Sequence, residues 1–412
     1  MVHEMRKMAN ATDKKPEETL IEEQATINEN IEEAQPAKPA TEEQKPTDSA
    51  SKPIWEIMKE LKESIARKLW DDEPKEDDKA DAKGSIDKKV SIDKKAPDYE
   101  IIITMPPFSK YYNEIAINPF VNAIRYNSAT KTKKSPKKVL DFFKDNDYKE
   151  TWVDLKCRQL RVASDSEIPT KPMEITHKIS VDTPVEVVFN DGEAYAQLVE
   201  IEDGYKLKFD PKTPKTKFGQ GASLNITDDS FEIHGYFTRK DMRYIKEAKK
   251  RGMHNYMLSY VEEESDIQEM LKLDPDAKIV AKIESMKGLE FVKNIYPKYK
   301  DKVRLMAATG DLYVEVDQPH HIKNALEEII KADPNAIVAS RILSSCKNPG
   351  KMPECSEILS VNYLVDLGYK AFMLGDEFCL DRFDLDHYVY TPESSLPLRS
   401  ALGLLEAILK NK

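Results

Sequence analysis

The sequence predicts an α/β fold: a (β/α)8 barrel with a small β-rich lid domain inserted after its third strand, preceded by a disordered N-terminal arm. Three observations support this prediction. From Tyr99 onward, short apolar segments alternate with helical patterns, and polar residues follow the apolar segments. This pattern is typical of (β/α)8 barrels whose site lies on the face where the strands end. One stretch of about sixty residues alternates apolar and polar side chains with the period of a β-strand. The first 98 residues are charged and poor in aromatic side chains.

Composition narrows the class of protein. The chain has 412 residues and a formal net charge of −11. This acidic balance argues against a general nucleic-acid-binding protein. No apolar run approaches the roughly 18–20 residues that span a bilayer, so we expect no membrane span. The N-terminus lacks the apolar core of a signal peptide, and the four cysteines form no CxxC pair. We therefore expect a reduced, cytoplasmic protein.

The N-terminal arm, residues 1–98, is acidic and rich in lysine. Such a segment cannot bury enough apolar surface to offset its chain entropy, so we predict disorder. An amphipathic helix is expected at about 53–70, where five apolar residues line one face. They are Ile54, Met58, Leu61, Ile65 and Leu69. This helix either docks on its own barrel or on a partner protein, or is marginal and has no role.

The barrel is expected in two parts, residues 99–165 and 231–412, with eight strands. The strands are Glu100–Met105, Val121–Asn127, Thr151–Lys156, His254–Val261, Lys278–Ile283, Val303–Thr309, Ala336–Leu343 and Lys370–Asp376. Polar residues at or just beyond their carboxyl ends are Thr104, Arg125, Asn127, Asp154, Lys156, Lys282, Glu284, Asp311, Ser340 and Asp376. The expected helices include Lys240–Arg251, Glu264–Leu273, Gly288–Tyr299, His321–Ala332, Cys355–Leu367 and Leu398–Lys410. Gly252 stands where a helix C-cap is expected.

The inserted lid domain is expected at residues 166–230. Its strands Val185–Phe189, Tyr195–Ile201 and Tyr205–Phe209 are joined by two Asp-Gly turns. Asp-Gly between alternating runs is a strong hairpin signal.

The prediction of function depends mainly on the segment Lys278–Val316, which contains the candidate metal-binding and phosphate-binding residues. It is predicted to form a strand, a helix and a second strand. In a parallel unit of this kind, the polar residues at the carboxyl ends of both strands lie on the same face of the sheet or barrel. The carboxylates of Glu284 and Asp311 suit a hard divalent cation, and Lys282 suits a phosphate or an enolate. The alternative is that these are ordinary strand ends with solvated polar side chains.

The same segment resembles the pyruvate kinase family. Lys282-Ile283-Glu284 matches its K-I-E tripeptide, and Ala308–Tyr313 is similar to its A-R-G-D-L-G loop. Further matches follow in unbroken order from Tyr99 to the C-terminus. EIIITMPPFS, VNAIRYNSA, WVDLKCRQLR, ASRILSS and CSEILSVNYLVDLGYKAFMLGDE resemble the family's barrel motifs, and GASLNI resembles the G-V-N-L-P segment of its lid.

The resemblance implies transfer of a phosphoryl group from phosphoenolpyruvate to ADP, with Mg²⁺ and K⁺ as cofactors. It implies catalytic roles for Lys282, Arg125 and Ser340; substrate binding by Arg125, Lys282, Gly310, Asp311 and Ser340; Mg²⁺ at Glu284 and Asp311; K⁺ at Asn127 and Asp154; and nucleotide binding by Arg161 and Lys156. Two roles have alternatives. Asp154 is either a K⁺ ligand or part of an ion pair with Arg125, and the Ser340 hydroxyl either relays a proton or bonds to the backbone.

The sequence also departs from the family pattern. Ala129 and Gln159 replace residues linked to monovalent-cation use, Tyr313 replaces a glycine, and Glu262 stands where an arginine is usual. We expect no counterpart of the family's C-terminal regulatory domain. Two alternative functions therefore remain. One is a catalytically weakened barrel that acts as a binding or scaffold protein through the helix at about 53–70, and the other is a Mg-dependent pyruvate/oxaloacetate-type lyase.

Overall fold

The computed structural model describes residues 99–379 and 395–411, apart from 110, 131 and 349–351. The predicted N-terminal arm and its helix at about 53–70 lie outside the described residues.

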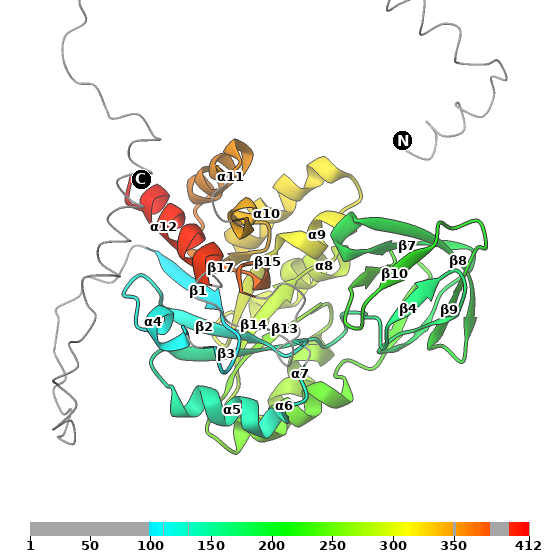
Figure 1. Cartoon of the computed structure of the whole chain (residues 1–412), viewed down its shortest axis with the longest axis horizontal. Helices are drawn as coiled ribbons and strands as arrows, with labels where there is room; N and C mark the ends of the chain where they lie inside the picture. The colour runs from blue at the N-terminus through cyan, green and yellow to red at the C-terminus, as the bar shows by residue number, and fades with distance from the viewer. Residues whose placement is uncertain (1–98, 110, 131, 349–351, 380–394, 412) are drawn as a thin grey trace, which may run out of the picture. The chain divides into compact units, whose positions relative to one another are not determined.

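Eight parallel strands form a closed barrel (Figure 1). They are β1 (Glu100–Thr104), β2 (Ala123–Asn127), β3 (Glu150–Leu155), β13 (Asn255–Leu258), β14 (Lys278–Ile283), β15 (Val303–Ala308), β16 (Ile337–Ala339) and β17 (Ala371–Leu374). The order around the barrel is β1-β17-β16-β15-β14-β13-β3-β2. This arrangement, with a β-rich insertion after β3, confirms the predicted fold class.

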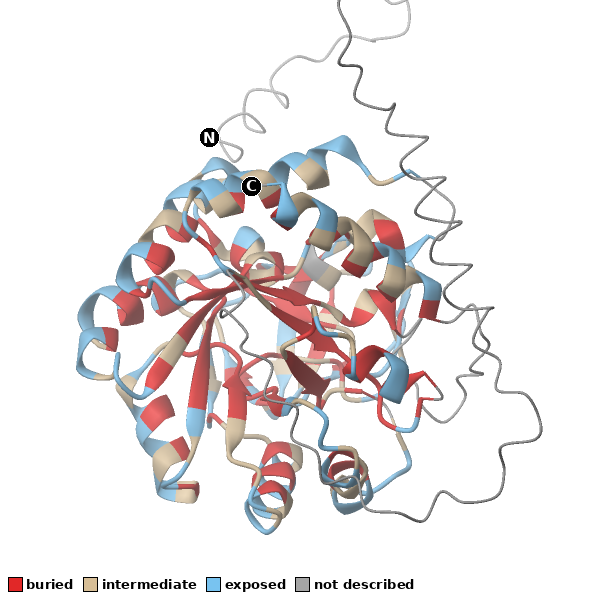
Figure 2. Ribbon diagram, turned by 90° about the vertical axis from the view of Figure 1, so that its left-hand side faces the viewer, coloured by how far each residue is buried: buried red, intermediate tan, exposed pale blue. Residues whose placement is uncertain are grey.

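Side chains alternate between two cores along each barrel strand. In β1, Ile102 belongs to the smaller core inside the barrel, to which all eight strands contribute and which includes Met257 and Val280. Ile101 and Ile103 point outward into the larger core between strands and helices. The strands are therefore buried on both faces, whereas each helix buries only one (Figure 2). Burial on both faces explains why the strands read as continuous apolar runs.

The helices of the barrel cover its outer side, except for one that lies near the barrel mouth. They are α4 (Tyr112–Ala116), α5 (Pro136–Asp145), α6 (Arg239–Lys249), α7 (Glu264–Leu273), α8 (Met286–Asn294), α9 (Thr309–Glu315), α10 (Ile322–Ala332), α11 (Cys355–Asp366) and α12 (Leu396–Lys410). Short 3-10 turns are η2 (Asn190–Gly192), η3 (Tyr296–Lys298), η4 (Pro319–His321), η5 (Ser344–Lys347) and η6 (Asp376–Phe378). Gly252 has φ +65° just beyond α6, as expected for a C-cap.

Two sequence expectations differ from the structure near the barrel mouth. The resemblance implies a loop after β15, but this segment forms α9, whose buried Leu312 anchors it to the barrel core. The strand expected over Ala336–Leu343 ends at Ala339, because Ser340 and Arg341 adopt left-handed φ angles of +67° and +55°.

The inserted domain has a core of its own and consists of short antiparallel strands. These are β4 (Ser166–Ile168), β5 (Met173–Glu174), β6 (Lys178–Ser180), β7 (Val185–Phe189), β8 (Ala194–Glu202), β9 (Lys206–Phe209), β10 (Thr216–Phe218), β11 (Leu224–Asn225) and β12 (Glu232–His234). Asp203 and Gly204 have the two positive φ angles of a tight hairpin turn, whereas Asn190–Gly192 forms a 3-10 turn instead. The domain limits at 166 and 230 remain a proposal.

Candidate active site

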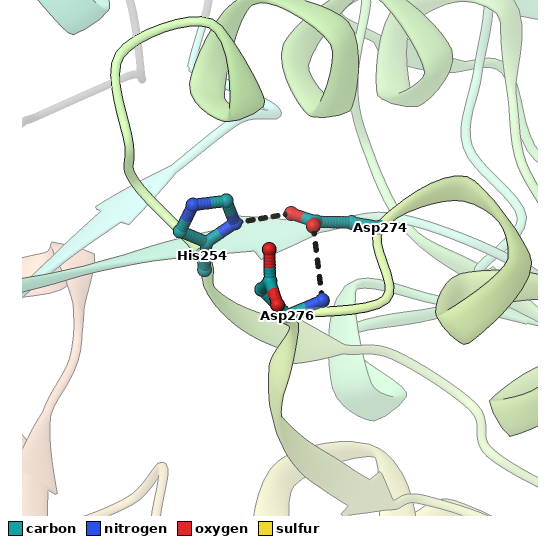
Figure 3. A group of neighbouring side chains, drawn as sticks. All are labelled: His254, Asp274 and Asp276. Atoms are coloured by element: carbon teal, nitrogen blue, oxygen red, sulfur yellow. Dashed lines mark hydrogen bonds and ion pairs between the residues drawn. The ribbon is translucent and has the colours of Figure 1, made fainter.

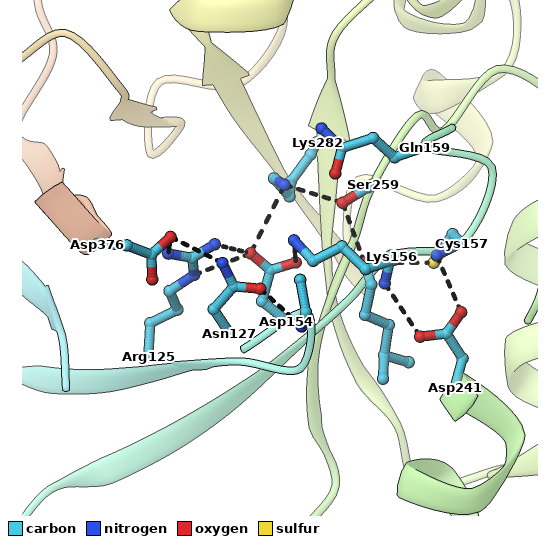
Figure 4. Close-up of polar contacts among 12 residues, drawn as sticks. Arg125, Asn127, Asp154, Lys156, Cys157, Gln159, Asp241, Ser259, Lys282 and Asp376 are labelled. Atoms are coloured by element: carbon cyan, nitrogen blue, oxygen red, sulfur yellow. Dashed lines mark hydrogen bonds and ion pairs between the residues drawn. The ribbon is translucent and has the colours of Figure 1, made fainter. Parts of the chain in front are cut away.

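Asp154 lies at the centre of a polar cluster at the carboxyl end of β3 (Figure 4). Its side chain is fully buried. Arg125 donates to Oδ2 through Nε at 2.8 Å and also through Nη2. The Nζ atoms of Lys282 and Lys156 lie 3.6 Å from Oδ2 and 3.8 Å from Oδ1, respectively. Burial opposes ionisation, but the lysines and Arg125 hold the pKa of Asp154 well below its usual range. Asp154 is therefore an anion that gathers three cations.

Arg125 and Asn127, both on β2, share a second carboxylate that the candidate set from the sequence lacks. Asp376 Oδ2 accepts from Arg125 Nη1 at 3.0 Å and from Asn127 Nδ2 at 2.7 Å. Arg125 Nη1 also donates to the hydroxyl of Thr104 at 3.0 Å. Burial would lower the pKa of Arg125, but Asp376 and Asp154 raise it. The guanidinium is thus permanently charged and is hydrogen-bonded to a carboxylate on each of two sides. The signal available in the sequence was the position of Asp376 at the end of the eighth strand.

Lys282 lies near the end of β14 with its ammonium group buried among polar groups. Its Nζ donates to Ser259 Oγ at 2.9 Å and lies 3.0 Å from Glu284 Oε1. Burial alone would lower the pKa of Lys282, but Asp154 and Glu284 raise it. The lysine therefore stays charged at neutral pH, as a group that neutralises a phosphate must.

Glu284 and Asp311, the two candidate Mg²⁺ ligands, are linked through Tyr260. The Tyr260 backbone N–H donates to Glu284 Oε2 at 2.7 Å, and its hydroxyl donates to Asp311 Oδ1 at 3.2 Å. Burial raises the pKa of Glu284; Lys282 opposes this effect and Asp311 adds to it. No ammonium or guanidinium group among the described residues forms an ion pair with Asp311. Two carboxylates with one lysine beside them fit a hard divalent cation.

Glu315 is a third carboxylate at this place that sequence reasoning missed. It lies four residues after Asp311, on the same face of α9, and accepts from Asn225 Nδ2 at 2.9 Å. Burial raises the pKa of Glu315 to about 8, and the neighbouring Asp311 adds to the shift. The spacing of four residues was a signal in the sequence, but only if the segment was recognised as a helix.

The candidate nucleotide-binding residues lie beside this cluster. Burial lowers the pKa of Lys156, against the opposing effect of Asp154. Arg161 donates to Gln159 Oε1 at 2.6 Å and to the Gly221 carbonyl oxygen at 2.7 Å. Arg161 therefore links the Gln159 side chain to the backbone of the inserted domain at Gly221.

Ser340 and Gly310 stand at the ends of neighbouring strands. Thr309 Oγ1 donates to the carbonyl oxygen of Ser340 at 2.7 Å, which joins the two loops through the backbone. Gly310 is buried in the first turn of α9. Tyr313 is 40% exposed, and Arg341 lies 4.8 Å above its ring, so Tyr313 packs against that loop.

The acidic residues after β13 have a cation of their own. Arg158 Nη2 lies 2.8 Å from Asp266 Oδ1, and Arg158 Nη1 lies 3.3 Å from Glu262 Oε2. The guanidinium also lies 5.0 Å from the centre of the Tyr236 ring. Glu262 is therefore compensated locally, although it occupies the place where the resemblance implies an arginine.

Two buried oxygens near the candidate K⁺ site accept no hydrogen bond from the part of the chain that the structure describes. They are Asp154 Oδ1 and Ser128 Oγ. The Ser128 backbone N–H donates to the Asp154 carbonyl oxygen at 3.0 Å, so the two residues adjoin. Asn127 Oδ1, by contrast, already accepts from Ala129 N. These two oxygens are suitable ligands for a monovalent cation. The fit is only partial, because Lys156 already places a positive charge near Asp154.

A separate group, His254, Asp274 and Asp276, has ligand atoms within 4.8 Å of one another (Figure 3). Its hydrogen bonds account for the arrangement. Asp274 Oδ2 accepts from His254 Nδ1 at 2.8 Å and from the Tyr256 hydroxyl at 2.9 Å, and Asp274 Oδ1 accepts from Asp276 N at 3.3 Å. Asp274 is the C-cap of α7, so we interpret the group as a structural cap.

Comparison with known proteins places the barrel in a family. The family model described as "Pyruvate kinase, barrel domain" matches residues 131–385, which include strands β3 to β17. The chain is similar to the pyruvate kinase of Methanocaldococcus jannaschii, at 24% identity over 70% of this chain and 66% of that protein. It is also similar to the pyruvate kinase of Borreliella burgdorferi, at 24% identity over 65% of this chain and 60% of that protein.

The chain thus spans less than two thirds of the length of these curated relatives. Of the helices in the described part of the chain, none combines the length and the apolar character needed to cross a membrane. The family match extends over more than half of the sequence and over most of the observed barrel, so the chain belongs to the pyruvate kinase family.

Proposed function

We propose that the chain transfers the phosphoryl group of phosphoenolpyruvate to ADP and releases pyruvate through its enolate. The observation that carries this proposal is the buried cluster in which Lys282 lies between Asp154 and the carboxylate of Glu284. A cation held at this point neutralises a phosphoryl group in transfer, while the neighbouring carboxylates hold the metal.

Each part of the substrate then has a partner. Lys282 and Arg125 neutralise the phosphoryl oxygens, and the backbone N–H groups of Gly310 and Asp311, in the first turn of α9, donate to the substrate carboxylate. Ser340 relays the proton that converts the enolate into pyruvate. Lys156 and Arg161 face the nucleotide.

Glu284 and Asp311 would hold Mg²⁺, which stabilises negative charge on the enolate oxygen when it is bound. Asp154 and Asn127 would hold K⁺, with Ser128 as a further oxygen donor.

Replacing Lys282 tests this proposal. Lys282→Met removes the charge that faces the phosphoryl group, and we expect ATP formation from phosphoenolpyruvate and ADP to fall by at least about a hundredfold. The matched control is Lys278→Met on the same strand, because Lys278 is exposed and pairs with Glu150 at the opposite end of the barrel. A coupled assay with Mg²⁺ and K⁺ measures both. Equal rates in the two variants would contradict the assignment of the site.

One observation favours a second function, that of a binding or scaffold protein with weakened catalysis. Arg125 donates to Asp154, Asp376 and Thr104, so phosphate binding requires it to exchange partners. The predicted route to a protein partner, the helix at about 53–70, lies outside the described residues. A wild-type chain that binds Mn²⁺ and phosphoenolpyruvate but forms no ATP would favour this second function.

A further inference from the structure

Two amide side chains, Gln159 and Asn225, flank two segments that pair where the chain enters the inserted domain: residues 160–162, which lead from the barrel, and residues 221–224 of that domain. These segments pair as an antiparallel ribbon of residues 160–162 and 221–224, which we call the connecting ribbon. Backbone hydrogen bonds of 2.9 and 3.4 Å join its two sides. Gln159 directly precedes one segment of the ribbon, and Asn225 directly follows the other.

Both amides donate to the carboxylate of Asp311, one to each oxygen. Gln159 Nε2 lies 2.9 Å from Oδ2, and Asn225 Nδ2 lies 3.4 Å from Oδ1. Both residues are buried, with 5% and 3% of their surface exposed. Because Arg161 donates to Gln159 Oε1, the Gln159 nitrogen must face Asp311. The direction of this donor is therefore fixed by a charged neighbour.

Asn225 extends the contact along α9. Its two N–H groups are shared among three acceptors, because Nδ2 also lies 2.9 Å from Glu315 Oε1 and 2.5 Å from the Tyr260 hydroxyl oxygen. The helix α9 packs against β11, which carries Asn225, and against the turn η2. A single amide from the inserted domain thus spans both carboxylates of α9.

We propose that Gln159 and Asn225 are positioning residues that fix the Asp311 carboxylate for a divalent cation, and that through them cation binding and the placement of the inserted domain are coupled. This inference rests on the cation site of the proposed function. Carboxylate ligands whose outer hydrogen-bond partners are removed commonly lose about 10–100-fold in metal affinity. Coupling is reciprocal, so a bound cation must also stabilise the connecting ribbon.

The test measures Mn²⁺ affinity of the full chain by water-proton relaxation. Gln159→Met and Asn225→Leu keep most of the side-chain volume but remove the N–H donors. We expect each to raise the Kd for Mn²⁺ at least about tenfold. The control is Gln197→Met, because Gln197 is an exposed amide on β8 of the same domain.

Hydrogen exchange of the connecting ribbon supplies a readout that a purely structural role would not change. In the wild type, saturating Mg²⁺ is expected to slow exchange at the amides of Val162 and Leu224. The double variant Gln159→Met/Asn225→Leu is expected to lose this response, although its ribbon still pairs. If Asn225→Leu does not fold, Asn225→Ala removes the same donor without added bulk and carries the same expectation.

Wild-type Mn²⁺ affinity in both single variants, or Mg²⁺ protection of the ribbon in the double variant, would overturn the inference. The proposed function fails in a different way, through a wild-type chain that binds Mn²⁺ and loses it in Asp311→Asn but forms no ATP.

Discussion

At the residue scale, Asp154 determines the electrostatics of the barrel mouth. It is fully buried and lies within ion-pair distance of Arg125, Lys156 and Lys282. A buried carboxylate surrounded by three cations is favourable only as a complete group, because each charge has been removed from water. Removing the anion therefore leaves three buried positive charges that repel one another.

Asp154→Asn is expected to lower the free energy of unfolding by about 3–5 kcal/mol, the usual cost of breaking a buried ion pair from one side. Glu150→Gln, on the same strand, serves as the control, because its pair with Lys278 is exposed and is worth about 0–1 kcal/mol. Urea denaturation at neutral pH measures both. A loss below about 1 kcal/mol in Asp154→Asn would show that the cluster is solvated.

His177 provides a residue-scale test of pH dependence. Burial lowers the pKa of His177 to about 4, and the nearby Arg158 adds to the shift. The folded state therefore binds this proton less readily than the unfolded state, whose histidine has a pKa of about 6.5. The associated stability is complete above a pH of about 6.5 and is lost as the pH falls from about 6.5 to about 4.

When the pH is lowered from about 7 to about 4, the free energy of unfolding of the wild type is accordingly expected to fall by up to about 3 kcal/mol relative to that of His177→Asn. Denaturation curves of both proteins over this range measure the difference. Stability curves that stay parallel would mean that folding leaves the pKa of His177 unchanged.

At the scale of elements, Asp241 joins helix α6 to the loop after β3. Its carboxylate forms the capping box with Thr238 and also accepts from the backbone N–H groups of Lys156 and Cys157 at 3.0 and 3.1 Å. One side chain therefore caps a helix and fixes the loop that carries Lys156.

Asp241→Ala is expected to lower the free energy of unfolding by at least about 3 kcal/mol, because two buried N–H groups lose their acceptor and the helix loses its cap. Thr238→Ala removes only part of the cap and is expected to cost about 1 kcal/mol. Thermal and urea unfolding compare the two variants. Equal losses would show that the contacts to the loop contribute little.

The strands were the most predictable elements, because each is an apolar run buried on both faces. β14 begins and ends where the sequence indicates, and α7 does so as well. The segment Thr309–Glu315 was less predictable, since Gly310 and Val314 are poor helix formers and the helix depends on burial of Leu312. Local propensity fails where tertiary packing supplies the stability.

At the scale of the whole molecule, closure of the barrel brings together residues that are distant in the sequence. Arg125 and Asp376 are 251 residues apart yet hydrogen-bonded. The strand-end rule predicted that Arg125, Asp154 and Lys282 would meet, and they do. It could not predict the contacts of Asn225, because these depend on where the inserted domain lies against α9. Nor could it show that Tyr260 links Glu284 to Asp311.

The proposed chemistry depends on Glu284 and Asp311 holding one divalent cation beside Lys282. Crystals of the full chain grown with Mn²⁺, with diffraction measured at the manganese absorption edge, would locate that cation. We expect one strong anomalous peak within about 2.0–2.3 Å of an oxygen of each carboxylate, and no such peak in Glu284→Gln. A peak at His254 and Asp274 instead, or none near Asp311 at saturating Mn²⁺, would contradict the assignment.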